Sequence, residues 1–267
     1  MVLRREMKVF ILYASLIAVA ETVTSLYDPS YGLLLHSALL ISLLALSALW
    51  HGANPASSLF LSLALAPLIR ILSLSLPLAH FPRHTWYLVT SVPVLASAIV
   101  AMRVQGMGLR DVGITLRKPL TQACIALTGV PFGITEYFIL RPEPLAVNLP
   151  LGSLALLAVA LIFSTGFVEE LVFRGVIQGS AVRALGEKAG VIGVAAIFAF
   201  LHIGWLSALE VLFVFSVGLF FGLMTLKTGS IIGVSLSHGM VNVFLFLVMP
   251  SLSQSLLTAP THTLSQL

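Results

Sequence analysis

The chain has 267 residues, of which 58% are hydrophobic and only 9% are charged. Because soluble domains carry about a quarter charged residues, this composition excludes a soluble globule and indicates an all-α, polytopic integral membrane helical bundle. The formal net charge of +4 does not indicate nucleic-acid binding, since the basic residues lie between apolar segments and form no patch. The single cysteine, Cys124, excludes an internal disulfide and a zinc site built on several cysteines.

Nine apolar segments are long enough to cross a bilayer, which takes roughly 20 residues of helix. We expect them at residues 8–27, 32–50, 56–79, 85–103, 120–140, 152–180, 189–206, 208–226 and 230–249. The count is eight or nine, because the first segment has a basic start (Arg4, Arg5 and Lys8) and contains the small residues Ala18 and Ala20, as a cleaved signal peptide would. Its apolar character continues to Tyr27, which favours a retained helix.

The longest polar connection divides the chain. Four helices are expected in residues 1–104, followed by a cytoplasmic interfacial linker at 105–119 and a transmembrane core at 120–250. A polar tail at 251–267, rich in serine and threonine, is expected to be loosely ordered.

The basic residues of the loops predict the orientation in the membrane. With the N-terminus in the cytoplasm, alternate loops place ten of them on the cytoplasmic side: Arg4, Arg5, Lys8, Arg103, Arg110, Arg117, Lys118, Arg183, Lys188 and Lys227. Only Arg83 and Arg141 fall on the opposite side, which is the bias that the positive-inside rule expects.

Three polar clusters interrupt the apolar core, where ionisable side chains are costly and usually functional. They are Glu169-Glu170 with Arg174, Phe198 with His202, and His238 with Asn242. Since residues four apart share a helix face, we expect Glu170 to pair with Arg174, while Glu169 is turned away by about 100°. Counted along the helix rise from the cytoplasmic side, Glu169, the two histidines and the asparagine lie about 13 to 20 Å deep and can meet in one layer.

These side chains fit the hydrolysis of an amide by an activated water. A glutamate beside a neutral histidine can deprotonate water, and a second histidine with an asparagine amide can donate hydrogen bonds to an oxyanion. The Gly-x-Ser-x-Gly nucleophile elbow is absent from the sequence. We expect no cofactor, and zinc held by the two histidines and a glutamate is the alternative, although His-Glu-x-x-His is also absent. A purely structural network of both glutamates with Arg174 remains a third interpretation.

In this order and in successive membrane segments, the three clusters resemble the CAAX protease and bacteriocin-processing family, which includes the type 2 CAAX prenyl endopeptidases. The resemblance covers residues 165–242, and Gly108–Ile114 is similar to a stretch that often precedes the core in that family. The roles that it implies are activation of water by Glu169 with His202, stabilisation of the oxyanion by His238 with Asn242, and support of the site by Glu170 with Arg174.

The resemblance implies an intramembrane glutamate endopeptidase with residues 120–250 as its catalytic core. Some members remove the last three residues of prenylated CAAX proteins, whereas others act in bacteriocin maturation or immunity, so proteolysis is better supported than CAAX cleavage. The expected partners are membrane lipids and a protein or peptide substrate, prenylated in the CAAX case, and no nucleic acid. We expect a prokaryotic cell membrane, with the site open to the cytoplasmic side.

Two other functions stay open at this point. A non-proteolytic scaffold or bacteriocin self-immunity protein of the same family would keep the motifs without cleaving a peptide. A proton-coupled transporter would use the buried glutamates and histidines as a relay, although no inverted repeat is visible. Among the other charged residues in predicted spans, Arg70 is expected to pair with Glu21 or Glu136.

Overall fold

The structure is a computed structural model that describes residues 5–50, 54–146 and 149–258. Within these ranges the secondary structure is helical, without a strand. The helices are α1 (Arg5–Leu26), α2 (Pro29–Leu49), α3 (Pro55–Leu63), α4 (Leu65–Ser75), η1 (Leu78–His80), η2 (Arg83–Thr85), α5 (Trp86–Val104), α6 (Pro119–Leu127), α7 (Gly129–Leu140), α8 (Leu151–Leu161), η3 (Ile162–Phe167), α9 (Val168–Glu170), η4 (Leu171–Ile177), α10 (Gln178–Leu185), α11 (Glu187–Phe200), η5 (Ile203–Trp205), α12 (Ala208–Thr228), α13 (Ile232–Val243), η6 (Phe244–Val248) and α14 (Met249–Thr258).

In the described residues these helices make nine segments that are long and apolar enough to cross a membrane. They coincide with the nine predicted segments to within a few residues, and the bundle is polytopic and all-α as expected. The sixth is the longest, running for 35 residues from Leu151 to Leu185 through α8, η3, α9, η4 and α10. The last helix continues to Thr258, into the segment expected to be a loosely ordered tail, while Arg4 and residues 259–267 lie outside the described residues.

Prolines explain why two of the spans consist of two helices each. A proline inside a helix removes a hydrogen bond and its ring collides with the carbonyl four residues earlier. That carbonyl belongs to Leu63 for Pro67 and to Leu127 for Pro131, and these are the residues at which α3 and α6 end. The two breaks therefore follow directly from the sequence.

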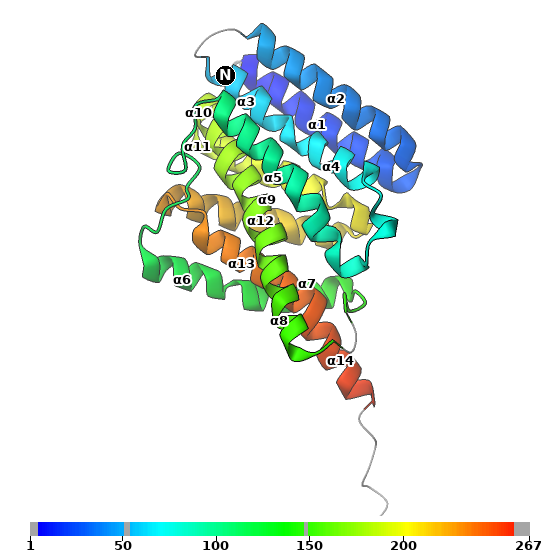
Figure 1. Cartoon of the computed structure of the whole chain (residues 1–267). Coiled ribbons are helices and arrows are strands. Elements are labelled where there is room, and N and C mark those ends of the chain that lie inside the picture. The colour runs from blue at the N-terminus through cyan, green and yellow to red at the C-terminus, as the bar shows by residue number, and fades with distance from the viewer. Residues whose placement is uncertain (1–4, 51–53, 147–148, 259–267) are drawn as a thin grey trace, which may run out of the picture.

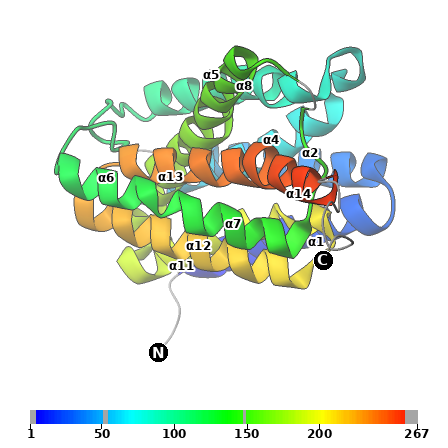
Figure 2. The ribbon, with the colours of Figure 1, turned by 90° about the horizontal axis from the view of Figure 1, so that it is seen from below.

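The bundle has two groups of helices that meet around the sixth span. α1 and α2 form an antiparallel pair, in which α2 packs on α3 and α4 and α1 packs on α11 (Figure 1). The view from below shows α6 and α7 beside α13 and α14, with α12 next to α7 (Figure 2). α1 contributes Phe10, Tyr13 and Ile17 to the core.

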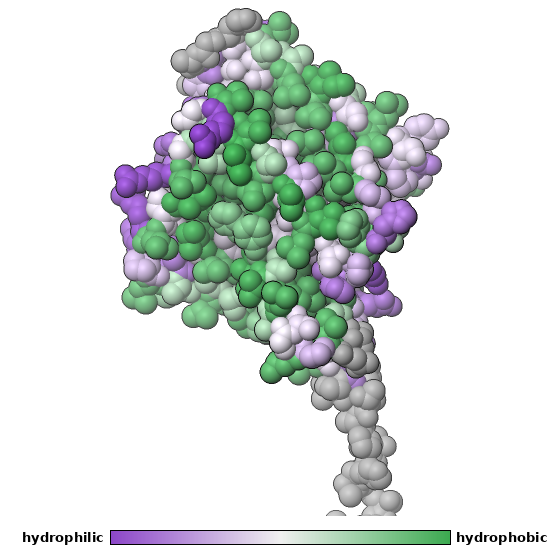
Figure 3. Space-filling model, viewed as in Figure 1, coloured by the Kyte–Doolittle hydropathy of each residue, from purple (hydrophilic) through white to green (hydrophobic). Residues whose placement is uncertain are grey.

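The outer surface fits a bilayer. Large apolar side chains such as Ile11, Val19, Ile41, Val100 and Leu156 are exposed on the spans. In the space-filling view, apolar residues form a broad band and hydrophilic ones gather mainly toward its margins (Figure 3). Apolar surface that the protein itself leaves uncovered on this scale indicates contact with lipid, so the helices lie in a membrane.

The sixth span contains two π-helical segments, η3 and η4, which enclose the short α9 that carries both glutamates. π-turns are rare and occur frequently at functional sites. Glycines let α13 approach this segment closely: a Cβ on Gly166 would strike the carbonyl of Ser235, and one on Gly239 would strike Ile162. This contact brings the third polar cluster, on α13, next to the first.

Candidate active site

Glu170 lies at the centre of a buried polar network. Its Oε1 accepts a hydrogen bond from Arg174 Nη1 at 2.8 Å and another from His238 Nδ1 at 2.8 Å. The predicted pair of Glu170 with Arg174 is therefore present. Both side chains are almost fully buried, and Arg174 also stacks on the ring of Phe198, 4.4 Å from its centroid. Arg174 thus balances the charge of Glu170, which makes Glu170 a residue that orients others rather than one that contacts solvent.

The hydrogen bond that His238 donates to Glu170 determines which of its ring nitrogens remains available. Because a carboxylate accepts, Nδ1 of His238 carries the proton, and Nε2 points to the other side. Nε2 lies 4.0 Å from Oε2 of Glu169. The side chain of Glu169 is 32% exposed, whereas that of Glu170 is 0% exposed. The two adjacent glutamates therefore have different surroundings, and Glu169 is the one that can reach a substrate or a water.

The imidazole of His202 is held in place by a backbone carbonyl at the end of α11. Its Nδ1 donates to the carbonyl of Phe198 at 2.9 Å, which leaves Nε2 free. The ring of Phe198 also packs against His202, His238 and Phe173, with centroids 4.9, 5.8 and 4.9 Å away. Phe198 therefore separates the two imidazoles and supports both, which is a physical reason for a phenylalanine one turn before this histidine.

Asn242 lies one turn beyond His238 on α13. Its Nδ2 donates to Oγ1 of Thr165 at 2.8 Å, and Thr165 in turn donates to the carbonyl of Leu161 at 2.7 Å. These two hydrogen bonds in series hold the side-chain amide of Asn242 in place and leave its second N–H available. The sequence analysis did not single out Thr165, because the sequence shows it only as one polar residue in an apolar span.

One cavity unites the candidate residues. Its walls include Glu169, His202, His238 and Asn242, together with Thr165. Glu170 and Arg174 do not line it, in keeping with the supporting role inferred for them. Tyr87 of α5 also lines this cavity and was likewise missed from the sequence, where a tyrosine near a helix start is unremarkable.

The other buried charges separate into two groups. Arg70 pairs with Glu21 rather than with Glu136. Its Nε donates a hydrogen bond to Oε1 of Glu21 at 2.7 Å, and its Nη2 lies 2.7 Å from Oε2 and donates to the carbonyl of Leu201 at 2.7 Å. Glu136 lines the active cavity and lies against Glu210, whose carboxylate has no hydrogen-bond partner.

Zinc is not supported by the arrangement of donor groups. Among the described residues, no three His, Cys, Asp or Glu side chains are placed so that they could hold a metal ion. We therefore derive no step through a metal.

Comparison with known proteins identifies the segment that carries these residues. The sequence model of the family described as type II CAAX prenyl endopeptidase Rce1-like matches residues 151–244. Residues 151–244 are thus similar to this family. The match confirms the resemblance to the CAAX protease family and contains all three polar clusters, and this family is a protease family. No curated protein and no solved structure matches the chain.

Proposed function

We propose that this protein is an intramembrane endopeptidase that hydrolyses a peptide bond with a water activated by Glu169 and His202. The observation that carries the proposal is the single cavity onto which both residues open together with His238 and Asn242. Its support comes from the different environments of the two glutamates: Glu170 is bonded to a cation and a histidine, whereas Glu169 is partly exposed and has no hydrogen bond of this kind.

In the proposed reaction, Glu169 removes a proton from water as the oxygen attacks the carbonyl carbon of the substrate. The resulting oxyanion receives hydrogen bonds from the free N–H of Asn242 and from Nε2–H of His238. His238 can donate from Nε2 only when doubly protonated, because Nδ1–H is already bonded to Glu170, and a carboxylate on that side stabilises the imidazolium. When the C–N bond breaks, the leaving amine takes the proton held by Glu169, and the products are a carboxylate and an amine.

Removal of the C-terminal tripeptide of a prenylated CAAX-type protein is the substrate reaction that the family suggests for this site. A matched pair of farnesylated and unlipidated CAAX peptides tests it, using the purified protein in detergent. We expect Glu169→Gln and His202→Ala to abolish cleavage while the folded protein persists. Glu143→Gln is a matched control, since Glu143 is 84% exposed and lies outside the cavity.

Cleavage retained in both Glu169→Gln and His202→Ala would refute the mechanism. The alternative function, a scaffold or bacteriocin self-immunity protein, predicts no cleavage and a cellular phenotype that survives both substitutions. The metal-free mechanism predicts that activity survives strong chelation and that elemental analysis finds no stoichiometric zinc; loss of activity that added zinc restores would contradict it.

A further inference from the structure

The basic linker at 105–119 is bonded to the turn between α12 and α13. The amide of Ile231 donates to the carbonyl of Gly113 at 2.9 Å, and the hydroxyl of Ser230 donates to the carbonyl of Thr115 at 2.7 Å. The linker joins α5 to α6, so both connections lie between helices of successive membrane spans. The place where they meet is therefore at a surface of the membrane.

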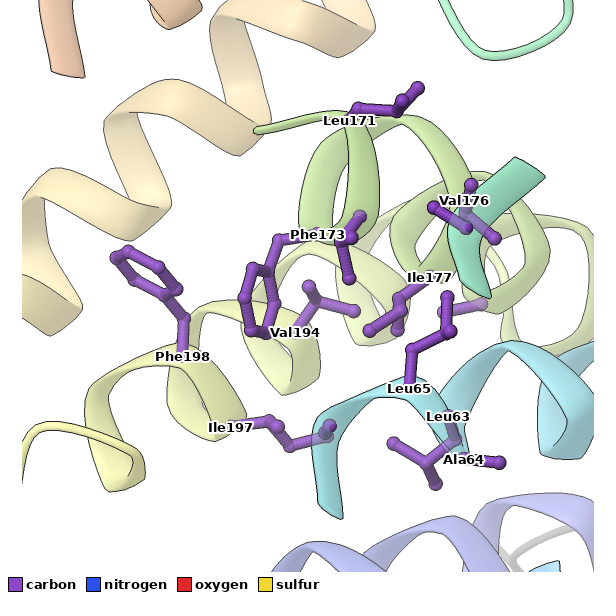
Figure 4. Packing of buried hydrophobic residues seen from close by; sticks show 14 of the residues in the cluster. Leu63, Ala64, Leu65, Leu171, Phe173, Val176, Ile177, Val194, Ile197 and Phe198 are labelled. Atoms are coloured by element: carbon purple, nitrogen blue, oxygen red, sulfur yellow. The ribbon is translucent and has the colours of Figure 1, made fainter. Parts of the chain in front are cut away.

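The linker is also anchored in the core. Val112 is buried and belongs to the main hydrophobic cluster, and Figure 4 shows part of that cluster around Leu171 and Val176. The carbonyl of Val112 lies so close to Gly175 that a Cβ added there would approach it to 2.9 Å. Because the backbone is fixed from both sides, the exposed side chains of the linker start from defined positions, which lowers the entropy cost of binding a ligand.

A groove opens on the exposed side of the linker. Its volume is about 550 Å³, within the range of about 300–1,000 Å³ that is typical of small-molecule sites. Lys118 follows the last linker residue of this groove, and its Nζ donates to the carbonyl of Lys227 at 3.4 Å, at the end of α12. The residues that line the groove, called here the linker groove, are Arg110, Ile114, Thr115, Leu116, Arg117 and Gly229.

The two guanidinium groups of the linker groove have no counter-ion. In the part of the chain that the structure describes, neither Arg110 nor Arg117 forms an ion pair or a side-chain hydrogen bond. Asp111 is the one acidic residue in the linker sequence, and its Oδ2 accepts from the amide of Gly108 at 2.7 Å. Two unpaired guanidinium groups on one groove attract an anion, and their planar N–H groups match the oxygens of a phosphate.

Apolar side chains stand exposed beside these cations. Leu116, which lines the linker groove, is 81% exposed, and Leu109 and Leu120 are exposed as well. A soluble anion would leave these leucines in water, whereas a lipid offers them acyl chains. Charge and apolar surface side by side at a membrane surface therefore match a ligand that has both a negative headgroup and hydrocarbon chains.

We infer that the linker groove binds the headgroup of an anionic phospholipid. Arg110 and Arg117 hold the phosphate, and Leu116 lies against an acyl chain. This lipid site is separate from the active cavity, because none of the residues of the linker groove lines that cavity. The inference does not depend on the proposed peptidase activity.

Native mass spectrometry of the purified full chain in detergent tests the site by counting bound lipids. Phosphatidylglycerol is the anionic probe, and phosphatidylcholine with the same acyl chains is the reference without net charge. We expect one phosphatidylglycerol to bind at concentrations at which phosphatidylcholine does not. The double variant Arg110→Gln, Arg117→Gln should weaken this binding roughly thirtyfold, about fivefold for each basic side chain.

The matched control removes two positive charges elsewhere. Lys8→Gln with Lys188→Gln replaces exposed lysines near the starts of α1 and α11, outside the linker groove. Screening limits the effect of such distant charges, so we expect this control to weaken binding by less than about threefold. The single variants Arg110→Gln and Arg117→Gln replace the double variant where circular dichroism shows that it does not fold.

A further arm distinguishes a lipid from a free anion. Inorganic phosphate at the same concentration should not displace phosphatidylglycerol, and Leu116→Ser should weaken lipid binding several-fold, because an acyl contact is lost. The inference is overturned by equal binding of the two lipids, by an equal loss in the lysine control, by displacement with equimolar phosphate, or by unchanged lipid binding in either the arginine or the Leu116→Ser variants.

Discussion

Arg70 connects the N-terminal helices to the helices that carry the candidate site. Its replacement by methionine should lower the free energy of unfolding by an amount that the structure allows us to predict. The guanidinium holds the carboxylate of Glu21 with one hydrogen bond, from Nε to Oε1, and one ion-pair contact, between Nη2 and Oε2, each 2.7 Å long, and Glu21 is 0% exposed. After Arg70→Met, the only remaining polar neighbour of that carboxylate among the described residues is Nε2 of His36, at 3.3 Å. Removing one partner of a buried ion pair costs about 3–5 kcal/mol. Because the Arg70 side chain is 22% exposed, we expect the lower end of that range.

A double-mutant cycle isolates the cause. Glu21→Gln removes the buried charge, so the double variant Glu21→Gln, Arg70→Met should lose about 1–2 kcal/mol rather than the sum of the two single losses. The free energy of unfolding is measured by titration with SDS in mixed micelles, followed by tryptophan fluorescence. Arg83→Met is the control, because its pair with Glu143 is long, at 3.7 Å, and exposed, so its loss should cost about 0–1 kcal/mol.

The same substitution should also lower kcat. Nη2 of Arg70 binds the carbonyl of Leu201, the residue before His202, at 2.7 Å. Loss of this bond frees the end of α11 and allows the His202 ring to move, while the cavity walls that bind substrate stay in place. We expect kcat to fall with little change in KM. An Arg70→Met variant as stable as the wild type, or additive with Glu21→Gln, would refute the reasoning.

Four further measurements probe the site and the fold. Thr165→Val removes the acceptor that orients the amide of Asn242. The lost hydrogen bond, worth about 1 kcal/mol, should lower kcat roughly five- to tenfold. An unchanged kcat would show that other contacts orient the amide. Gly239→Ala should destabilise the protein by about 1–3 kcal/mol in SDS titration, since the new Cβ collides with η3. Glu136→Gln should raise stability, because the amide donates a hydrogen bond to the neighbouring carboxylate, and a decrease would argue against the carboxyl pair. A hydrogen bond from the Ser30 amide holds the pKa of Asp28 below its usual value, so its stabilisation is present above about pH 4 and is lost as pH falls through the lowered pKa; Asp28→Asn should weaken this acid dependence of unfolding.

The sequence alone determined the membrane architecture and the local part of the site. Each span was predictable because a run of apolar residues must be helical in lipid, where backbone groups have no water to bond. The breaks at Pro67 and Pro131 and the pair of Glu170 with Arg174 are equally local, since they depend on residues four positions apart on one helix.

Only the tertiary structure decided which helices are neighbours and how each is rotated. The second partner of Glu170 is His238, 68 residues away in sequence, and Arg70 could have met Glu136 as well as Glu21. The π-turns on both sides of α9 shift the helix register, so the direction of Glu169 cannot be read from an α-helical period. The lining of the active cavity comes from side chains of several spans together, so a correct helix count does not predict it.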